Sequence, residues 1–227
     1  MLLLCAMLKE EKKRGEIMTY QFDQRIDRKK SNALKWSDEF LENRYGHKDI
    51  LPMWIADMDF QVAQPIQKAL KKAAEHGIYG YPYARNAFYE AIIHWQEKRH
   101  QWSVKRNWLF FNPGVIPALK ALVGLFSEKG QKVIIQSPVY HPFARIIKES
   151  GRLVADNALQ DNEGYYTIDF QGLETLAQDP QTNLMIFCSP HNPVGRVWTK
   201  EELTKVAEIC LKHDVILVSD EIHADLV

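Results

Sequence analysis

Polar side chains that can do chemistry follow three of the apolar runs in this 227-residue sequence. Asp220 and His223 follow the run VILVS, Asn192 follows NLMIFC, and Tyr140 follows KVIIQ. Carboxylate and imidazole groups can hold or move protons, and amide and phenol groups can donate hydrogen bonds to a ligand. Because ligands bind at the carboxyl ends of parallel strands, we expect these loops to form one site.

Asp220 stands where an acidic group needs a partner. A carboxylate at the end of a buried strand is costly if it stays isolated. Its partner could be the protonated ring nitrogen of a heterocyclic cofactor, although position alone favours a helix cap or an ion pair with a nearby Arg or Lys. His223 could bind a metal, but no second histidine lies at helical ligand spacing, so we predict no metal site.

Other candidate residues have both a structural and a functional interpretation. Asn192 lies in a Pro-His-Asn-Pro turn, where asparagine is common, but it could also donate to a phenolate oxygen. Tyr140 is either a core aromatic or a face on which a planar ring stacks. Tyr81, in the aromatic loop 79–83, either packs at a cavity entrance or contacts a phosphate. The loop 112–116 leads into a helix N-terminus, where free N–H groups can hold phosphate.

The elements that must position these residues alternate between helix and strand. Apolar residues at helical spacing predict a helix that begins near Pro65 and ends at Gly77. Thr199 and Glu202 form the capping-box pattern of a helix start. Further helices are expected at 87–101, 115–126, 140–150, 170–178 and 199–213, and strands at 108–111, 132–136, 152–155, 183–188 and 215–219. Short apolar strands between helices predict a parallel sheet covered on both faces.

Composition excludes some classes of function. The sequence has 29 basic and 29 acidic residues, and a formal net charge of zero argues against a nucleic-acid partner. No run approaches the roughly 20 apolar residues of a membrane span, so no membrane role is expected. Cys5, Cys188 and Cys210 form no CxxC pair, which favours reduced thiols in a cytoplasmic protein.

Six motifs together resemble the pyridoxal phosphate (PLP) enzymes of the aspartate aminotransferase fold, and in particular the MalY/PatB-type cystathionine β-lyases. The motifs are LPMWIADMDF (51–60), YGY (79–81), NPGVIP (112–117), SPVYHPF (137–143), SPHNPVGRVW (189–198) and SDEIHADL (219–226). The resemblance runs from about residue 20 to residue 227. It implies an α/β fold, namely the three-layer, mainly parallel sheet of the PLP-dependent transferase major domain, truncated, with an N-terminal part of the small domain.

The resemblance implies three segments. Residues 18–64 would be an N-terminal arm and small-domain segment, and residues 65–227 an incomplete PLP-binding major domain. Residues 1–17 place an apolar run before a charge run, the reverse of a secretory signal. We expect Met18 to be the true start and these first residues to be a flexible or wrongly assigned extension.

The resemblance also implies how the cofactor phosphate and ring are held. The backbone N–H groups of Val115 and Ile116 would bind the phosphate, and Tyr140 would stack on the ring. Tyr81 would cross the interface of a homodimer to the phosphate held by the neighbouring subunit.

The polar atoms of the cofactor have their own implied partners. Asn192 and His223 would hydrogen-bond its phenolic oxygen, and Asp220 would pair with its ring nitrogen. The substrate pocket would be lined by four consecutive residues: Trp54, Ile55, Ala56 and Asp57.

The implied activity is carbon–sulfur β-lysis of cystathionine or another cysteine S-conjugate to a thiol, pyruvate and ammonia. His223 favours the lyase branch, because many aminotransferases of this fold carry Tyr there. The alternatives are an aminotransferase of the same fold, or a non-catalytic remnant or interaction module. The Schiff-base lysine of the family follows the strand that ends at Asp220, whereas the last lysine here is Lys212. No catalytic residue is therefore assigned, and the isolated chain is expected to be inactive.

Overall fold

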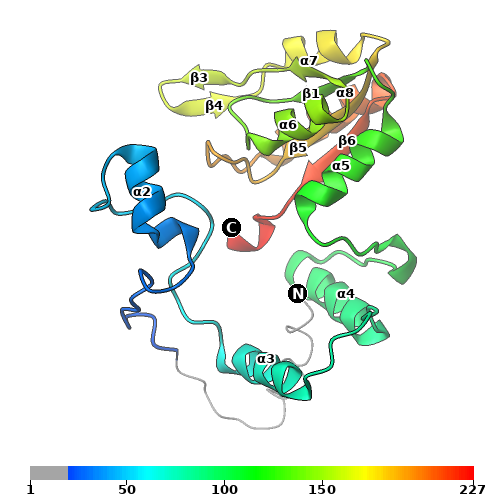
Figure 1. The fold of residues 1–227 in the computed structure, drawn as a ribbon. Coiled ribbons are helices and arrows are strands. Elements are labelled where there is room, and N and C mark those ends of the chain that lie inside the picture. Colours follow the sequence, from blue (N-terminus) through cyan, green and yellow to red (C-terminus); the bar gives the residue numbers. More distant parts are fainter. Residues whose placement is uncertain (1–19) are drawn as a thin grey trace. The chain divides into compact units, whose positions relative to one another are not determined.

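The structure is a computed structural model that describes residues 20–227 (Figure 1). The chain divides into two compact units, with the boundary after residue 110. We refer to residues 20–110 as the first unit and to residues 111–227 as the second. The extension expected at residues 1–17 and the start expected at Met18 lie outside the described residues. The boundary expected at residue 65 stays a prediction.

The regular structure of the first unit is helical. Ser37 caps the first of its α-helices, since its side chain accepts a hydrogen bond from the backbone N–H of Phe40. The helix predicted to end at Gly77 is confirmed, and Gly77 adopts the left-handed φ of 67° that a C-cap glycine supplies. The elements are η1 (Leu34–Trp36), α2 (Asp38–Tyr45), α3 (Gln64–His76), α4 (Asn86–His100) and η2 (Arg106–Trp108).

The strand expected at residues 108–111 is wrong. Arg106–Trp108 instead form one 3₁₀ turn, and residues 109–111 lie outside the strands. Phe110 is 84% exposed and Phe111 is 58% exposed, so the apolar run covers no sheet face. A strand needs a neighbour for its backbone groups, and a short apolar run does not specify one.

The second unit contains a four-stranded parallel sheet in the order β2-β1-β5-β6. Each of its strands corresponds to an apolar run in the sequence. The parallel arrangement requires crossover connections, which the intervening helices supply. The strands are β1 (Lys132–Ile135), β2 (Leu153–Asp156), β5 (Thr182–Cys188) and β6 (Ile216–Asp220), and the helices are α5 (Val115–Phe126), α6 (Pro142–Glu149), α7 (Phe170–Ala177) and α8 (Lys200–Lys212).

Alternate residues of β5 enter two different cores. Met185 and Phe187 pack with buried residues of α7 and α8. Leu184 and Ile186 pack with buried residues of α5 and α6. Because successive side chains of a strand point to opposite faces, the sheet is covered by a helical layer on each side. The expected three-layer α/β fold is thus confirmed for the second unit.

A short antiparallel hairpin was not expected from the sequence. It pairs β3 (Gln160–Asn162) with β4 (Tyr165–Thr167). Its turn uses Glu163 and Gly164, both at positive φ (54° and 91°). The strands are short and largely exposed, so they lack the apolar pattern that would reveal them. Within residues 20–227, no helix is long and apolar enough to cross a membrane.

Candidate functional site

Hydrogen bonds join the loops that follow β1 and β5 to each other, and join the β5 loop to the end of β6. The His191 ring Nε2 lies 3.0 Å from the carbonyl oxygen of Pro138, which links the β5 loop to the β1 loop. The backbone N–H of Ser189 donates to the carbonyl oxygen of Asp220 at 3.0 Å, and Cys188 pairs with Asp220 in the sheet register. The three loops therefore share the carboxyl edge of the sheet, as predicted.

Asp220 is the buried carboxylate of this edge. It is 7% exposed, and its Oδ1 accepts a hydrogen bond from the backbone N–H of Ile222 at 3.1 Å. Among residues 20–227, no Lys or Arg forms an ion pair with it, although position alone favours such a pair. Burial raises the pKa of Asp220 above its ordinary value, while nearby His223 acts in the opposite direction. A cationic ligand would relieve this desolvated carboxylate.

Asn192 lies in a loop whose backbone is fixed on both sides. Its own N–H donates to the thiol sulfur of Cys188 at 3.5 Å. The N–H of His191 donates to the carbonyl of Arg196 at 2.8 Å, and that of Gly195 donates to the carbonyl of His191 at 2.8 Å. Within the described part of the chain, the Asn192 side-chain amide has no hydrogen-bond partner. The backbone of Asn192 is thus fixed, whereas its side-chain amide makes no hydrogen bond within the described residues.

The N-terminus of α5 offers free backbone donors. No side chain caps this helix, and Gly114 stands before it in an extended conformation. Val115 and Ile116 occupy its first two positions, where helical N–H groups have no intrahelical acceptor. Pro117 follows without an N–H. The other end of α5 leads into the start of β1, so these donors lie toward the carboxyl edge of the sheet (Figure 1). A phosphate is the kind of group that such a helix start binds.

Tyr140 and His223 are less enclosed than Asp220. Tyr140 is 38% exposed, and its ring meets Phe143 edge-to-face with centroids 5.9 Å apart. The ring is therefore not a fully buried core aromatic, which leaves surface for stacking. His223 is half-buried and directly precedes the final 3₁₀ turn, η3 (Ala224–Leu226).

The remaining candidates belong to the first unit. Tyr81 is fully exposed in the loop between α3 and α4. Trp54 stacks on Phe40 with centroids 5.2 Å apart, and its buried Nε1 has no partner among the described residues. Ile55 is half exposed at φ 63°, and the Asp57 carboxylate binds Arg28 at 2.9 Å. Ala56, the fourth expected pocket residue, is exposed.

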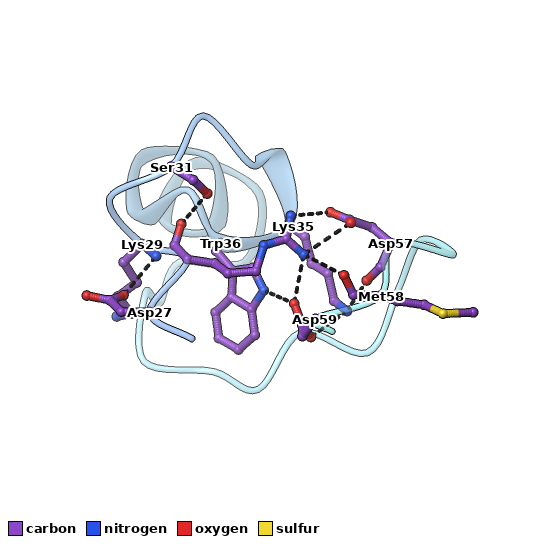
Figure 2. Close-up of polar contacts among 9 residues, drawn as sticks. Asp27, Lys29, Ser31, Lys35, Trp36, Asp57, Met58 and Asp59 are labelled. Carbon is purple, nitrogen blue, oxygen red and sulfur yellow. Dashed lines mark hydrogen bonds and ion pairs between the residues drawn. The ribbon is translucent and has the colours of Figure 1, made fainter. Parts of the chain in front are cut away.

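Sequence reasoning missed two features. The first is His191, whose imidazole links two loops; it is 2% exposed, and burial lowers its pKa. The second feature is a polar cluster in the first unit, shown in Figure 2. Its members come from segments more than 20 residues apart, so no local pattern could have revealed it. We call it the Asp59 cluster, and it consists of Arg28, Lys35, Trp36, Asp57 and Asp59.

Comparison with known proteins identifies the family. The sequence pattern described as aminotransferase class I and II matches residues 48–227. The chain belongs to this family. Cystathionine β-lyase PatB of Bacillus subtilis is 43% identical over 205 residues, which cover 90% of this chain and 52% of that protein. Protein MalY of Escherichia coli is 35% identical over 209 residues, which cover 92% of this chain and 53% of that protein.

A solved structure supports the same assignment. Cystalysin from Treponema denticola, described as containing a pyridoxal 5'-phosphate cofactor, matches with a TM-score of 0.85 and 40% identity over 92% of this chain and 53% of that chain. The chain thus spans about half the length of the relatives it matches. The family and fold expected from the six motifs are confirmed, and PLP is the cofactor of this family.

Proposed function

We propose that this chain contributes the PLP-binding region of a carbon–sulfur β-lyase that acts on sulfur-containing amino acids such as cystathionine. The relatives named cystathionine β-lyase and the cystalysin structure support this assignment. The proposal assigns the cofactor contacts to the residues implied by the six motifs: Tyr81, Val115, Ile116, Tyr140, Asn192, Asp220 and His223.

The observation that carries the proposal is the buried Asp220 carboxylate at the carboxyl end of β6. It has no Lys or Arg partner among residues 20–227, and it lies beside the loop that holds Asn192. A protonated pyridine nitrogen supplies the missing positive charge, and the free N–H groups of Val115 and Ile116 suit a phosphate. The residues present therefore fit PLP.

In this proposal, four candidate residues of the second unit each have a defined role. Asp220 accepts the hydrogen bond of the ring nitrogen and keeps that nitrogen protonated. Asn192 and His223 donate to the phenolic oxygen, and Tyr140 restricts the ring orientation by stacking. When bound, PLP supplies an electron sink for the electrons released at the substrate Cα.

The proposal includes a homodimeric assembly and a cytoplasmic location. Tyr81 is fully exposed, which suits a residue that reaches the phosphate of a neighbouring subunit in a homodimer. Cys188 and Cys210 are buried free thiols, which suits the cytoplasm.

Titration of the purified chain with PLP tests the proposal, with fluorescence and cofactor absorbance as readouts. The parent chain is expected to bind PLP, and Asp220→Asn is expected to weaken binding by about tenfold or more, because the amide oxygen still accepts a hydrogen bond but lacks the negative charge that pairs with the protonated ring nitrogen. Asp179→Asn is the matched control, since Asp179 pairs with Lys132 at the start of β1, the opposite edge of the sheet. No PLP binding by the parent chain, or equal binding by Asp220→Asn, would overturn the proposal.

A further inference from the structure

The His191 imidazole lies between the β1 loop, which carries Tyr140, and the β5 loop, which carries Asn192. The residue is 2% exposed, and its Nε2 lies 3.0 Å from the carbonyl oxygen of Pro138, two residues before Tyr140. A carbonyl oxygen can only accept a hydrogen bond, so Nε2 carries the hydrogen. The imidazole therefore donates a hydrogen bond from one loop to the other.

His191 is fixed within its own loop. Its backbone N–H donates to the carbonyl oxygen of Arg196, and its carbonyl oxygen accepts from the N–H of Gly195, both at 2.8 Å. Its ring meets the Trp198 ring edge-to-face, with centroids 5.5 Å apart. The Trp198 indole N–H in turn donates to the carbonyl oxygen of Cys188 at 2.9 Å. The imidazole therefore projects from a fixed point of the β5 loop.

The β1 loop is fixed near its start and near its end. The Ser137 N–H and hydroxyl donate to the two carboxylate oxygens of Asp156, at 3.0 and 2.6 Å. The carbonyl oxygen of Tyr140 accepts from the N–H of Phe143 in α6 at 3.0 Å. Pro138 lies between these anchors, so the hydrogen bond from the imidazole sets the position of the middle of this loop relative to the β5 loop.

Packing alone does not account for a histidine at position 191. Its Nδ1 is buried and has no hydrogen-bond partner among the described residues. A buried polar atom without a partner costs stability, and a phenylalanine would fill similar space without that cost. What distinguishes histidine here is Nε2, and Nε2 joins the two loops.

We propose that His191 is a positioning residue that, through its hydrogen bond to Pro138, holds Tyr140 and Asn192 at the separation that the PLP ring requires. This inference rests on the proposed function, in which Tyr140 stacks on the ring and Asn192 donates to its phenolic oxygen. His191 acts through the two loops, because its own side chain is buried and offers no surface to a ligand.

Titration of the purified chain with PLP, followed by fluorescence and cofactor absorbance, compares three substitutions. His191→Gln places an amide N–H at about the position of Nε2, whereas His191→Phe keeps a ring beside Trp198 but has no donor. His191→Asn carries the same amide on a side chain one carbon shorter, too short to reach Pro138. We expect His191→Gln to bind PLP within twofold of the parent chain. His191→Phe and His191→Asn should bind about fivefold more weakly, because the hydrogen bond between the loops is lost.

A double-mutant cycle with Asn192→Ala separates positioning from a general loss of stability. The Asn192 amide makes no hydrogen bond within the described residues, so its removal leaves the backbone contacts of the loop in place. In this background His191→Phe should weaken PLP binding by less than twofold, because the amide that it would position is gone. His213→Phe is the matched control, since His213 hydrogen-bonds Glu174 at 2.6 Å before β6, at the opposite edge of the sheet. It should bind PLP as the parent chain does.

Each outcome decides the inference. Equal PLP binding by His191→Phe and the parent chain overturns the positioning role, and so does binding by His191→Gln that is as weak as that of His191→Phe. A loss in the Asn192→Ala background as large as in the parent chain also overturns it. If His191→Phe does not unfold cooperatively in urea, His191→Asn takes its place in each comparison. A parent chain that binds no PLP refutes the proposed function, and the inference fails with it.

Discussion

At the scale of single residues, the surroundings of Asp220 disfavour its charged form. Its carboxylate is desolvated, and among the described residues it has no basic partner to compensate for this. Functional sites often keep groups that cost stability in the unliganded protein. The same carboxylate should therefore weaken the cofactor-free fold and strengthen cofactor binding.

The pH dependence of unfolding tests whether the Asp220 carboxylate destabilises the cofactor-free fold. Burial raises the pKa of Asp220, so the folded chain binds its proton more tightly than the unfolded chain does. The folded state therefore loses stability as pH rises from about 4 through the raised pKa. Without PLP, Asp220→Asn should melt at a higher temperature than the parent chain at pH 7, and the difference should shrink as the pH is lowered to about 4. A lower melting temperature for Asp220→Asn at pH 7 would contradict this.

Asp179→Asn provides the opposite case. Hydrogen bonds from Lys132 and from the backbone N–H of Gln181 lower the pKa of Asp179. Its stabilising contribution is present above the ordinary pKa and is lost as pH falls through the lowered value. This variant should melt at a lower temperature than the parent chain at pH 7, so the two substitutions should have effects of opposite sign.

At the scale of elements, the start of α8 stabilises the loop that carries Asn192. Thr199 and Glu202 form the predicted capping box. The Arg196 guanidinium also donates from Nη2 to both carboxylate oxygens of Glu202, at 2.9 and 2.8 Å. This guanidinium lies over the rings of Tyr165 and Trp198. Glu202 thus connects the cap of α8 to Arg196, whose carbonyl oxygen accepts the hydrogen bond from His191 that closes the loop.

Urea unfolding of three α8 variants tests this double role. Thr199→Ala should cost about 1 kcal/mol, because it removes one helix cap. Glu202→Ala should cost about 3 kcal/mol, because Arg196, whose side chain is 9% exposed, keeps its charge without its carboxylate partner. The exposed Glu208→Ala should change the free energy of unfolding by less than about 0.5 kcal/mol. Equal effects of Thr199→Ala and Glu202→Ala would argue against the double role.

At the scale of the whole molecule, the position of the lysines limits the chemistry of the chain. The last lysine, Lys212, lies before β6 at the end of α8. Its side chain is 65% exposed and pairs with Glu174 at 2.7 Å. A lysine that acts as a base is a desolvated amine, and Lys212 is neither desolvated nor at the carboxyl edge of the sheet.

The 227-residue chain is therefore expected to release no pyruvate from cystathionine, even with added PLP. A coupled lactate dehydrogenase assay measures this, with a complete cystathionine β-lyase as the positive control. Pyruvate release by this chain would show that another residue replaces the lysine. Turnover that requires an added 2-oxo acid would favour an aminotransferase over a lyase.

Much of the second unit could be predicted from sequence, because its signals are local. Apolar runs predicted all four strands of the parallel sheet, and the Thr199–Glu202 pattern predicted the start of α8. The β3–β4 hairpin escaped prediction because its strands are short and exposed. The strand expected at 108–111 was wrong because pairing depends on a neighbour that no local pattern supplies.

The sequence by itself determined the order of the four parallel strands and of the helices between them, the family, and the identity of the residues that match its motifs. These depend on side-chain periodicity and on the sequence of motifs, which a linear chain contains. Only the tertiary structure decided that Asp220 has no Lys or Arg partner within residues 20–227, and that Asp59 binds Arg28, Lys35 and Trp36. Burial and long-range hydrogen bonds depend on which distant residues meet, and that is fixed only when the chain folds.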